Sequence, residues 1–303
     1  MNFSLYYKIK KYRKLGCDLE DKMGKIVNQI YSEERALYHL EDAEVVNCVF
    51  AGSLDGESVL KESRNIVVKD SSFSLRYPIW HAQNFLVENS IFDEKTRAPF
   101  WYDFKGKINN STIYGTKFLR ECHDVLINNS TIKSDECGWM CKDITLINSH
   151  LTSEYVFLNS KDITIDKLDF NGKYSFQYVE NMTIESSSLD TKDAFWHSKN
   201  VTVKNSTIKG EYLAWFSEGL TLVNCTIISH QPFCYCKNLR LINCAMENCD
   251  LAFEYSDVEA DVVSKIDSIK NPKSGKIICD SVSEIIKDEP IYECSAVIEV
   301  RNL

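Results

Sequence analysis

The sequence predicts an all-β protein whose chain winds into a single-stranded parallel β-helix. Three observations lead to this prediction. One unit of about 19 residues recurs along most of the chain. Within the unit, apolar residues alternate with polar ones, and many are β-branched or aromatic, which favours strands over helices. A unit of this length is also too short for a propeller blade or a pair of helices, so stacked coils of parallel strands are the expected solution.

The repeat begins with an Asx or Gly residue, followed by an apolar–x–apolar pattern, a polar pair and a small residue. Clear copies begin at Asn65, Asn84, Asp124, Asn200 and Asn238. Unit starts fall at 42, 65, 84, 105, 124, 143, 162, 181, 200, 219 and 238, so the spacing is 23, 19 and 21 residues and then 19 seven times. These starts predict about 11 coils. The handedness of parallel crossovers predicts that the helix is right-handed.

The extent of the repeat predicts three regions. Residues 30–257 form the β-helix, with residues 30–41 completing a first partial coil. Residues 1–29 are expected to form an N-terminal cap. The repeat register is lost after Asp257, so residues 258–303 are expected to form a C-terminal cap, because solenoids need capped ends.

Columns of equivalent residues predict which side chains face inward. When the first residue of each unit is place 0, places 1, 3 and 8 are apolar in nearly every copy, and place 6 is mostly Ser or Cys. Place 5 is Asn in eight copies, which suits a corner with left-handed backbone and amides that bond between coils. The 12 Cys are therefore predicted to be mostly small core residues. We expect neither a metal ion nor a cofactor.

The third side of each coil, places 11 to 18, carries the candidate binding surface. All five Trp fall in one column, place 15, once the longer units are allowed for. We assign this column outward and place 14 inward, because Lys61, Arg120 and Gln177 share the Trp column and buried charges are costly. A shift of one residue would instead bury the Trp side chains. In either register a row of aromatic side chains faces outward, which is typical of a binding site.

The predicted ligand-binding residues lie on this face: Trp80, Trp101, Tyr102, Arg120, Trp139, Gln177, Tyr178, Trp196 and Trp215. Arg120 lies one coil from a Trp on each side, so we expect its guanidinium to stack on both rings and to hold a carboxylate or phosphate. Rows of Trp beside carboxylates and cations resemble sugar-binding clefts in composition. The expected ligand is therefore a carbohydrate or another small polar or anionic molecule.

Two other interpretations stay open. In the first, the protein is an enzyme that acts on carbohydrate as a lyase, hydrolase or isomerase. Its candidate catalytic residues are Arg120, Glu121, His81, His197 and Lys192. Alternatively, it is a scaffold that binds another protein or forms a homo-oligomer through the same row. A net charge of −9 argues against nucleic-acid binding, which needs a basic footprint. No apolar run is long enough to span a membrane, and no signal peptide is recognisable, so we expect a cytoplasmic location.

Several longer strings resemble a known family: YPIWHAQNF, KTRAPFWYD, YSFQYVENM, DTKDAFWHSKNVTV, GEYLAWFSE, AFEYSDVEADV and SIKNPKSGKI. They resemble the uncharacterised bacterial domain-of-unknown-function family 3737, over roughly residues 28–290. The resemblance implies a right-handed, pectin-lyase-like β-helix, and it implies no established activity or catalytic residues. Lyases and hydrolases of that broader fold usually carry their sites on the first parallel sheet. Here the outward places of that sheet hold mostly Thr, Lys and Asn, without an Asp cluster.

Overall fold

A computed structural model describes residues 23–52, 57–288 and 290–301. Most of the N-terminal cap predicted at residues 1–29 lies outside these residues. The described residues contain strands, turns and bends, and no helix among them is long and apolar enough to cross a membrane. The strands are β1 (Gly24–Val27), β2 (Ile30–Tyr31), β3 (Glu41–Val46), β4 (Val49–Phe50), β5 (Arg64–Lys69), β6 (Ser72–Phe73), β7 (Ile79–Trp80), β8 (Gln83–Glu88), β9 (Ile91–Phe92), β10 (Phe100–Trp101), β11 (Phe104–Asn109), β12 (Thr112–Ile113), β13 (His123–Asn128), β14 (Thr131–Lys133), β15 (Lys142–Glu154), β16 (Lys161–Lys173), β17 (Glu180–Glu185), β18 (Ser188–Asp190), β19 (Lys199–Lys204), β20 (Thr207–Lys209), β21 (Thr221–Val223), β22 (Thr226–His230), β23 (Leu239–Asp250), β24 (Asp257–Lys270), β25 (Ser274–Ile286) and β26 (Val297–Val300).

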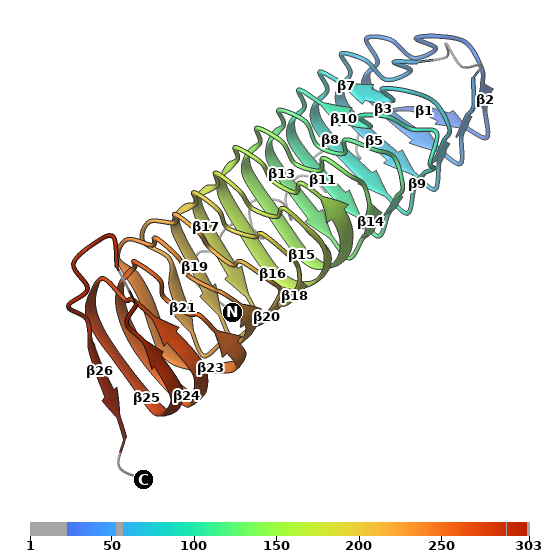
Figure 1. The fold of residues 1–303 in the computed structure, drawn as a ribbon. Helices are drawn as coiled ribbons and strands as arrows, with labels where there is room; N and C mark the ends of the chain where they lie inside the picture. Colours follow the sequence, from blue (N-terminus) through green and yellow to red (C-terminus); the bar gives the residue numbers. More distant parts are fainter. Residues whose placement is uncertain (1–22, 53–56, 289, 302–303) are drawn as a thin grey trace. The chain divides into compact units, whose positions relative to one another are not determined.

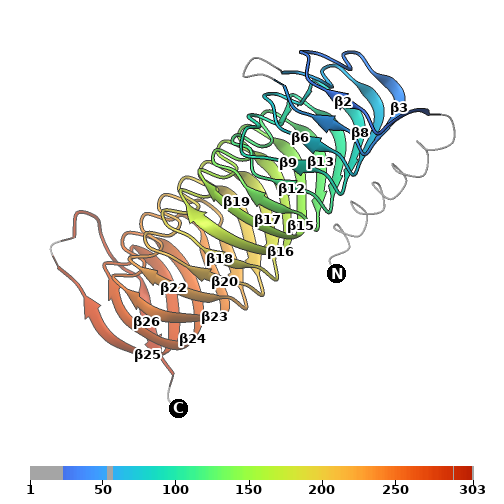
Figure 2. The same ribbon diagram turned by 90° about the vertical axis from the view of Figure 1, so that its right-hand side faces the viewer.

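The chain divides into two compact units. The first runs to Ser153 and includes Asp162–Thr164, and the second comprises Glu154–Lys161 and continues from Ile165. In the first unit, β3, β5, β8, β11 and β13 pair in parallel, one coil after another (Figure 1). In the second, β17, β19, β21 and β23 do the same, and Figure 2 shows β18, β20 and β22 following one another along a further side. The chain thus folds as the predicted right-handed parallel β-helix.

The helix has more coils than the repeat predicted, about 14 turns instead of 11. At the N-terminal end, β1 pairs with β3 before the first recognised unit. At the other end, β24, β25 and β26 continue the parallel pairing past residue 257. The repeat becomes unrecognisable there because the register shifts between Val262 and Lys265. The described part of the predicted C-terminal cap therefore contains further coils of the β-helix.

Stacked side chains fill the interior of each unit. In the first unit the rings of Phe50, Phe73 and Phe92 lie nearly parallel, with centroids 4.7 and 4.5 Å apart. Close packing between coils leaves no room for a side chain at Gly106. A Cβ atom on Gly106 would lie 2.0 Å from Cζ of Phe85 in the preceding coil, so no larger residue fits beneath that ring without a rearrangement.

Ladders of polar side chains hold the corners. Asn129 has φ 51° and donates from Nδ2 to Asn110 Oδ1 at 2.6 Å, as the corner prediction required. Beside it, the Ser and Cys column at place 6 does more than fill space. Ser111 Oγ accepts the backbone N–H of Ser90 at 3.2 Å and donates to the carbonyl of Asn109 at 2.8 Å. The column is hydroxyl or thiol because each corner leaves a buried amide to satisfy.

Candidate functional site

The Trp column faces outward, as assigned. Trp80 is opposite Trp101, and Arg120 is bridged to Trp101 on one side and Trp139 on the other. Every Trp side chain is half-buried, whereas Phe100 at place 14 is fully buried. The alternative register with buried Trp side chains is therefore wrong. The prediction fails at the end of the column. The 19-residue count also assigns Cys234 and Phe253 to place 15, but both are fully buried, and Phe253 stacks on Phe233 inside the second unit.

Two Trp residues of the first unit, Trp80 and Trp101, stack on each other. The Trp80 and Trp101 rings lie 5.6 Å apart at 17°, and Lys61 Nζ lies 4.2 Å from the centroid of Trp80. Tyr77 leans against both indoles at 5.8 Å. Neighbouring side chains thus cover the ring faces that a sugar would use. This column is a rigid wall, and it does not offer the open stacking platform suggested by its composition.

Arg120 is held by the chain itself. Its Cζ lies 4.8 Å from the centroid of Trp139, in agreement with one of the two predicted stacking contacts. Its Nη2 donates to Glu136 Oε2 at 2.7 Å, and Lys117 Nζ lies 3.1 Å from the same oxygen. The carboxylate that Arg120 was predicted to take from a ligand is therefore supplied by Glu136 of the next coil.

A pocket opens at the corner that joins the third side to the first. We call it the corner pocket; it has a volume of about 300 Å³ and is lined by Glu62, Arg64, His81 and Gln83. Glu62 and His81 are neighbours at place 16, and Arg64 and Gln83 are paired in register at the start of β5 and β8. The side chains between the two walls, Ser63 and Ala82, are small and buried. The pocket thus brings a carboxylate, a guanidinium, an imidazole and an amide around one space.

Aromatic side chains continue both walls of the corner pocket into the next coil. Tyr102 stacks on His81 with centroids 4.9 Å apart, and Phe104 follows Gln83 in register. Partial desolvation and then a hydrogen bond with Glu121 raise the pKa of the Tyr102 phenol. Glu121 also accepts a hydrogen bond from Trp101 Nε1 at 3.4 Å, so this predicted catalytic residue braces the aromatic wall.

The predicted residues of the second unit form a separate group. Trp196 and Trp215 stack at 5.4 Å and 4°, and their indole N–H groups donate to the carbonyls of Tyr212 and Gln231. Gln177 donates in the same way to the carbonyl of Asp193. These three predicted ligand-binding side chains therefore donate hydrogen bonds to backbone carbonyl groups of the next coil.

The outer ring column of the second unit consists of Tyr178, His197, Phe216 and Tyr235. Adjacent centroids lie 4.8, 5.0 and 4.8 Å apart, with the rings almost parallel. His197, a catalytic candidate, is thus enclosed between two rings. Lys192, another candidate, is paired with Glu211 at 2.8 Å, and this hydrogen bond raises the pKa of the lysine.

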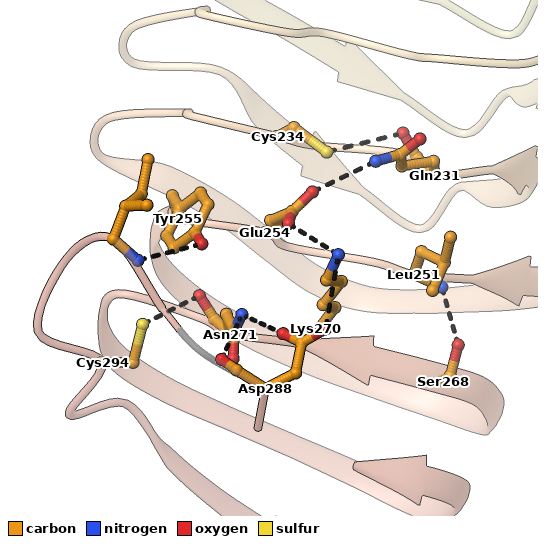
Figure 3. Close-up of polar contacts among 11 residues, drawn as sticks. Gln231, Cys234, Leu251, Glu254, Tyr255, Ser268, Lys270, Asn271, Asp288 and Cys294 are labelled. Atoms are coloured by element: carbon orange, nitrogen blue, oxygen red, sulfur yellow. Dashed lines mark hydrogen bonds and ion pairs between the residues drawn. The ribbon is translucent and has the colours of Figure 1, made fainter. Parts of the chain in front are cut away.

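One irregularity creates polar contacts that the repeat does not predict. A register shift between Ile228 and His230 puts His230 opposite Asp250, with Nδ1 and Oδ1 2.8 Å apart. The same shift brings Glu254 into the Trp column. Figure 3 shows Glu254 between Gln231 Nε2 and Lys270 Nζ, each at 3.1 Å, with Lys270 also 3.9 Å from Asp288. These contacts fix the end of the column.

Sequence reasoning found only part of the corner pocket. It named His81 as a catalytic candidate and missed Glu62, Arg64 and Gln83 as site residues. The sequence did contain a signal for them: the pocket residues occupy two columns, places 16 and 18, which are separated in each of these coils by one small buried residue. The described cysteines form no disulfide with one another and are mostly buried. In the described part of the chain, no group of three or more His, Cys, Asp and Glu is arranged to hold a metal ion.

Comparisons with known proteins bear on fold and family. Residues 24–299 match a family described as "Protein of unknown function (DUF3737)". No curated protein matches. Similar solved structures include PfbA, a surface adhesin of Streptococcus pneumoniae, at 9% identity and TM-score 0.40 over 81% of this chain and 74% of that one. The Azotobacter vinelandii mannuronan C-5 epimerase AlgE4 A-module has 9% identity and TM-score 0.35, over 92% and 91%. A GH87 α-1,3-glucanase catalytic domain has 11% identity and TM-score 0.42 over 94% of this chain, which spans 65% of that domain.

Proposed function

Because the chain belongs to this family of unknown function, which assigns it no activity, we propose a function from its surface: the protein binds a carbohydrate in the corner pocket of its first unit. The observation that carries the proposal is the set of groups around this space. Glu62, Arg64, His81 and Gln83 line a pocket of about 300 Å³, a volume at the lower end of the usual range for small-molecule sites. Their side-chain groups are planar, and each can form more than one hydrogen bond. They therefore suit the closely spaced hydroxyl groups of a sugar, each of which both donates and accepts hydrogen bonds.

Contacts that hold two of these side chains, Glu62 and His81, support the proposal. His39 Nε2 lies 3.4 Å from Glu62 Oε2 on the side of the preceding coil. On the other side, Tyr102 stacks against His81, and Trp80 lies 5.8 Å from the same imidazole. Side chains held by neighbouring coils lose little entropy when a ligand binds, so a small polar site gains affinity. The aromatic third side serves this pocket as its rigid wall.

A glycan array followed by calorimetric titration of the strongest hit tests the proposal. Arg64→Ala and His81→Ala should each weaken binding at least about tenfold, because each removes a side chain that would hydrogen-bond to the ligand. Trp139→Phe should leave the affinity unchanged, because Trp139 lies under Arg120 and outside the pocket lining. Lys133→Ala, an exposed change elsewhere in the first unit, is the matched control. A folded protein that binds no glycan, or binding that survives both pocket changes, contradicts the proposal.

A cytoplasmic location is part of this proposal. Its support is chemical: the 11 described cysteines form no disulfide with one another, and ten of them are buried. Disulfides are rare in proteins kept in a reducing compartment. Fractionation of the source cells followed by thiol labelling of the unfolded protein would test it. Recovery outside the cytoplasm would refute it.

A further inference from the structure

The second unit repeats one arrangement on four consecutive coils, in which an aromatic ring is followed two residues later by a charge. The rings are those of the outer ring column. The charges form an alternating column, which we define as Glu180, Lys199, Glu218 and Lys237. One buried residue separates ring from charge in each coil: Val179, Ser198, Ser217 and Cys236. The rings and charges therefore form two adjacent rows along the same corner.

The charged side chains of the alternating column form few ion pairs within the chain. Glu180 is opposite Lys199, Lys199 is bridged to Glu218, and Glu218 to Lys237, and all four are exposed. Yet among the described residues the only ion pair made by this column joins Glu180 to Lys161, at 3.8 Å. On the opposite flank of the same unit, pairs such as Lys192–Glu211 close to 2.8 Å. The alternating column thus keeps most of its charge available to a partner.

The rings beside these charges expose their edges. Their faces are covered by one another at spacings of 4.8 to 5.0 Å, while Tyr178 and Phe216 remain 51% and 44% exposed. The result is a continuous aromatic ridge with a row of alternating charges beside it. Contiguous exposed apolar surface rimmed by polar residues is typical of a protein–protein contact.

We propose that this face binds a second copy of the chain, antiparallel, about a two-fold axis between the coils of His197 and Phe216. Such an axis places Lys199 opposite the partner's Glu218, and Glu180 opposite the partner's Lys237. Because both copies have the same coil spacing, the pairs stay in step along all four coils. An axis through a coil would oppose like charges, and an axis between any other two of these four coils would form fewer opposite-charge pairs within the alternating column. The central axis therefore uses the whole column in one self-complementary contact.

Sedimentation analysis of the full chain tests this inference over a wide range of concentrations. The mass should rise from one chain toward two as concentration increases, and the association should weaken at high salt because exposed charges are screened. The contact is small, so the dimer should be weak. Lys199→Glu places like charges opposite each other at two symmetry-related points and should weaken association at least about tenfold. Adding Glu218→Lys to Lys199→Glu puts opposite charges across the two-fold axis again and should recover the association.

Lys167→Glu is the matched control, because it reverses an exposed charge on another part of the same unit. Circular dichroism establishes that each variant is folded. A mass of one chain at every concentration overturns the inference. So does weakening by Lys199→Glu that Glu218→Lys fails to reverse. Loss of glycan binding by the pocket variants is a separate result, because the corner pocket lies in the first unit.

Discussion

The carboxyl group of Asp103 accepts the backbone N–H of Ala82 from the preceding coil at 2.7 Å, in a fully buried position. Its second oxygen has no hydrogen-bond partner among the described residues. Burial raises the pKa of Asp103 well above its usual range. Equivalent positions in other coils carry small residues, and there Ser256 Oγ accepts the N–H of Cys236 at 2.8 Å. Asp103 therefore accepts the same kind of backbone hydrogen bond as the serine, but its buried carboxyl group is hard to ionise.

Asp103→Ser should stabilise the protein at neutral pH. The folded pKa of Asp103 is raised, so the folded state binds more protons than the unfolded state above about pH 4. Wild-type stability therefore falls as pH rises toward that folded pKa, by up to about 1.4 kcal/mol per pH unit from this group. Urea unfolding of both proteins at several pH values measures the difference. The gain should shrink toward pH 4, and parallel pH profiles would contradict this explanation.

Ser111→Ala should destabilise the first unit by about 1–3 kcal/mol, because it leaves the buried amide of Ser90 without its acceptor. Ser111→Cys should cost less, since the equivalent Cys225 accepts a backbone hydrogen bond from Ser206. Denaturant unfolding gives both values. Ser188→Ala, an exposed change in β18, is the control and should lie near zero. Equal losses for the Ala and Cys variants would refute the role of the acceptor.

Gly106→Ala should cost about 1–3 kcal/mol through overpacking against Phe85. Phe85→Leu removes the ring that the new methyl group would meet, and Ile66 shows that an aliphatic residue fits the adjacent position of the column. The double variant should therefore be more stable than the sum of the single changes by about 1–2 kcal/mol. A double-mutant cycle from chemical unfolding measures this coupling. Additive losses would show that the clash is not with Phe85.

Arg120→Met should lower stability without changing glycan binding. The substitution removes a guanidinium that is bonded to Glu136 and packed on Trp139, and its side chain is only 15% exposed. Breaking such a half-buried pair should cost about 1–3 kcal/mol, because Glu136 keeps only Lys117 as a partner. Thermal unfolding and calorimetric titration of one preparation separate the two effects. A loss of affinity in a stable variant would return Arg120 to the binding site.

The sequence determined the architecture because, in a β-helix, the length of the repeat fixes which residues of successive coils pair. A spacing of 19 residues brings Val125 opposite Ile144, and one longer unit of 21 residues brings Trp101 opposite Trp80. A shift of one residue in either pairing would turn polar side chains inward. The corner Asn residues and the inward places followed from the same columns. Charged members of the Trp column also identified its outward face correctly. All of these are consequences of a repeated local pattern.

Tertiary structure decided the directions and distances of side chains, and with them the site. Place 15 donors reach diagonally to place 12 of the next coil, so Arg120 meets Glu136 and Trp196 bonds to the carbonyl of Tyr212. Indole faces that look free in the sequence are covered once the coils stack. The corner pocket also depends on the angle between two sides of a coil, and His230 meets Asp250 only through one register shift. A period specifies which residues are neighbours, but rotamers and local bulges specify which atoms touch.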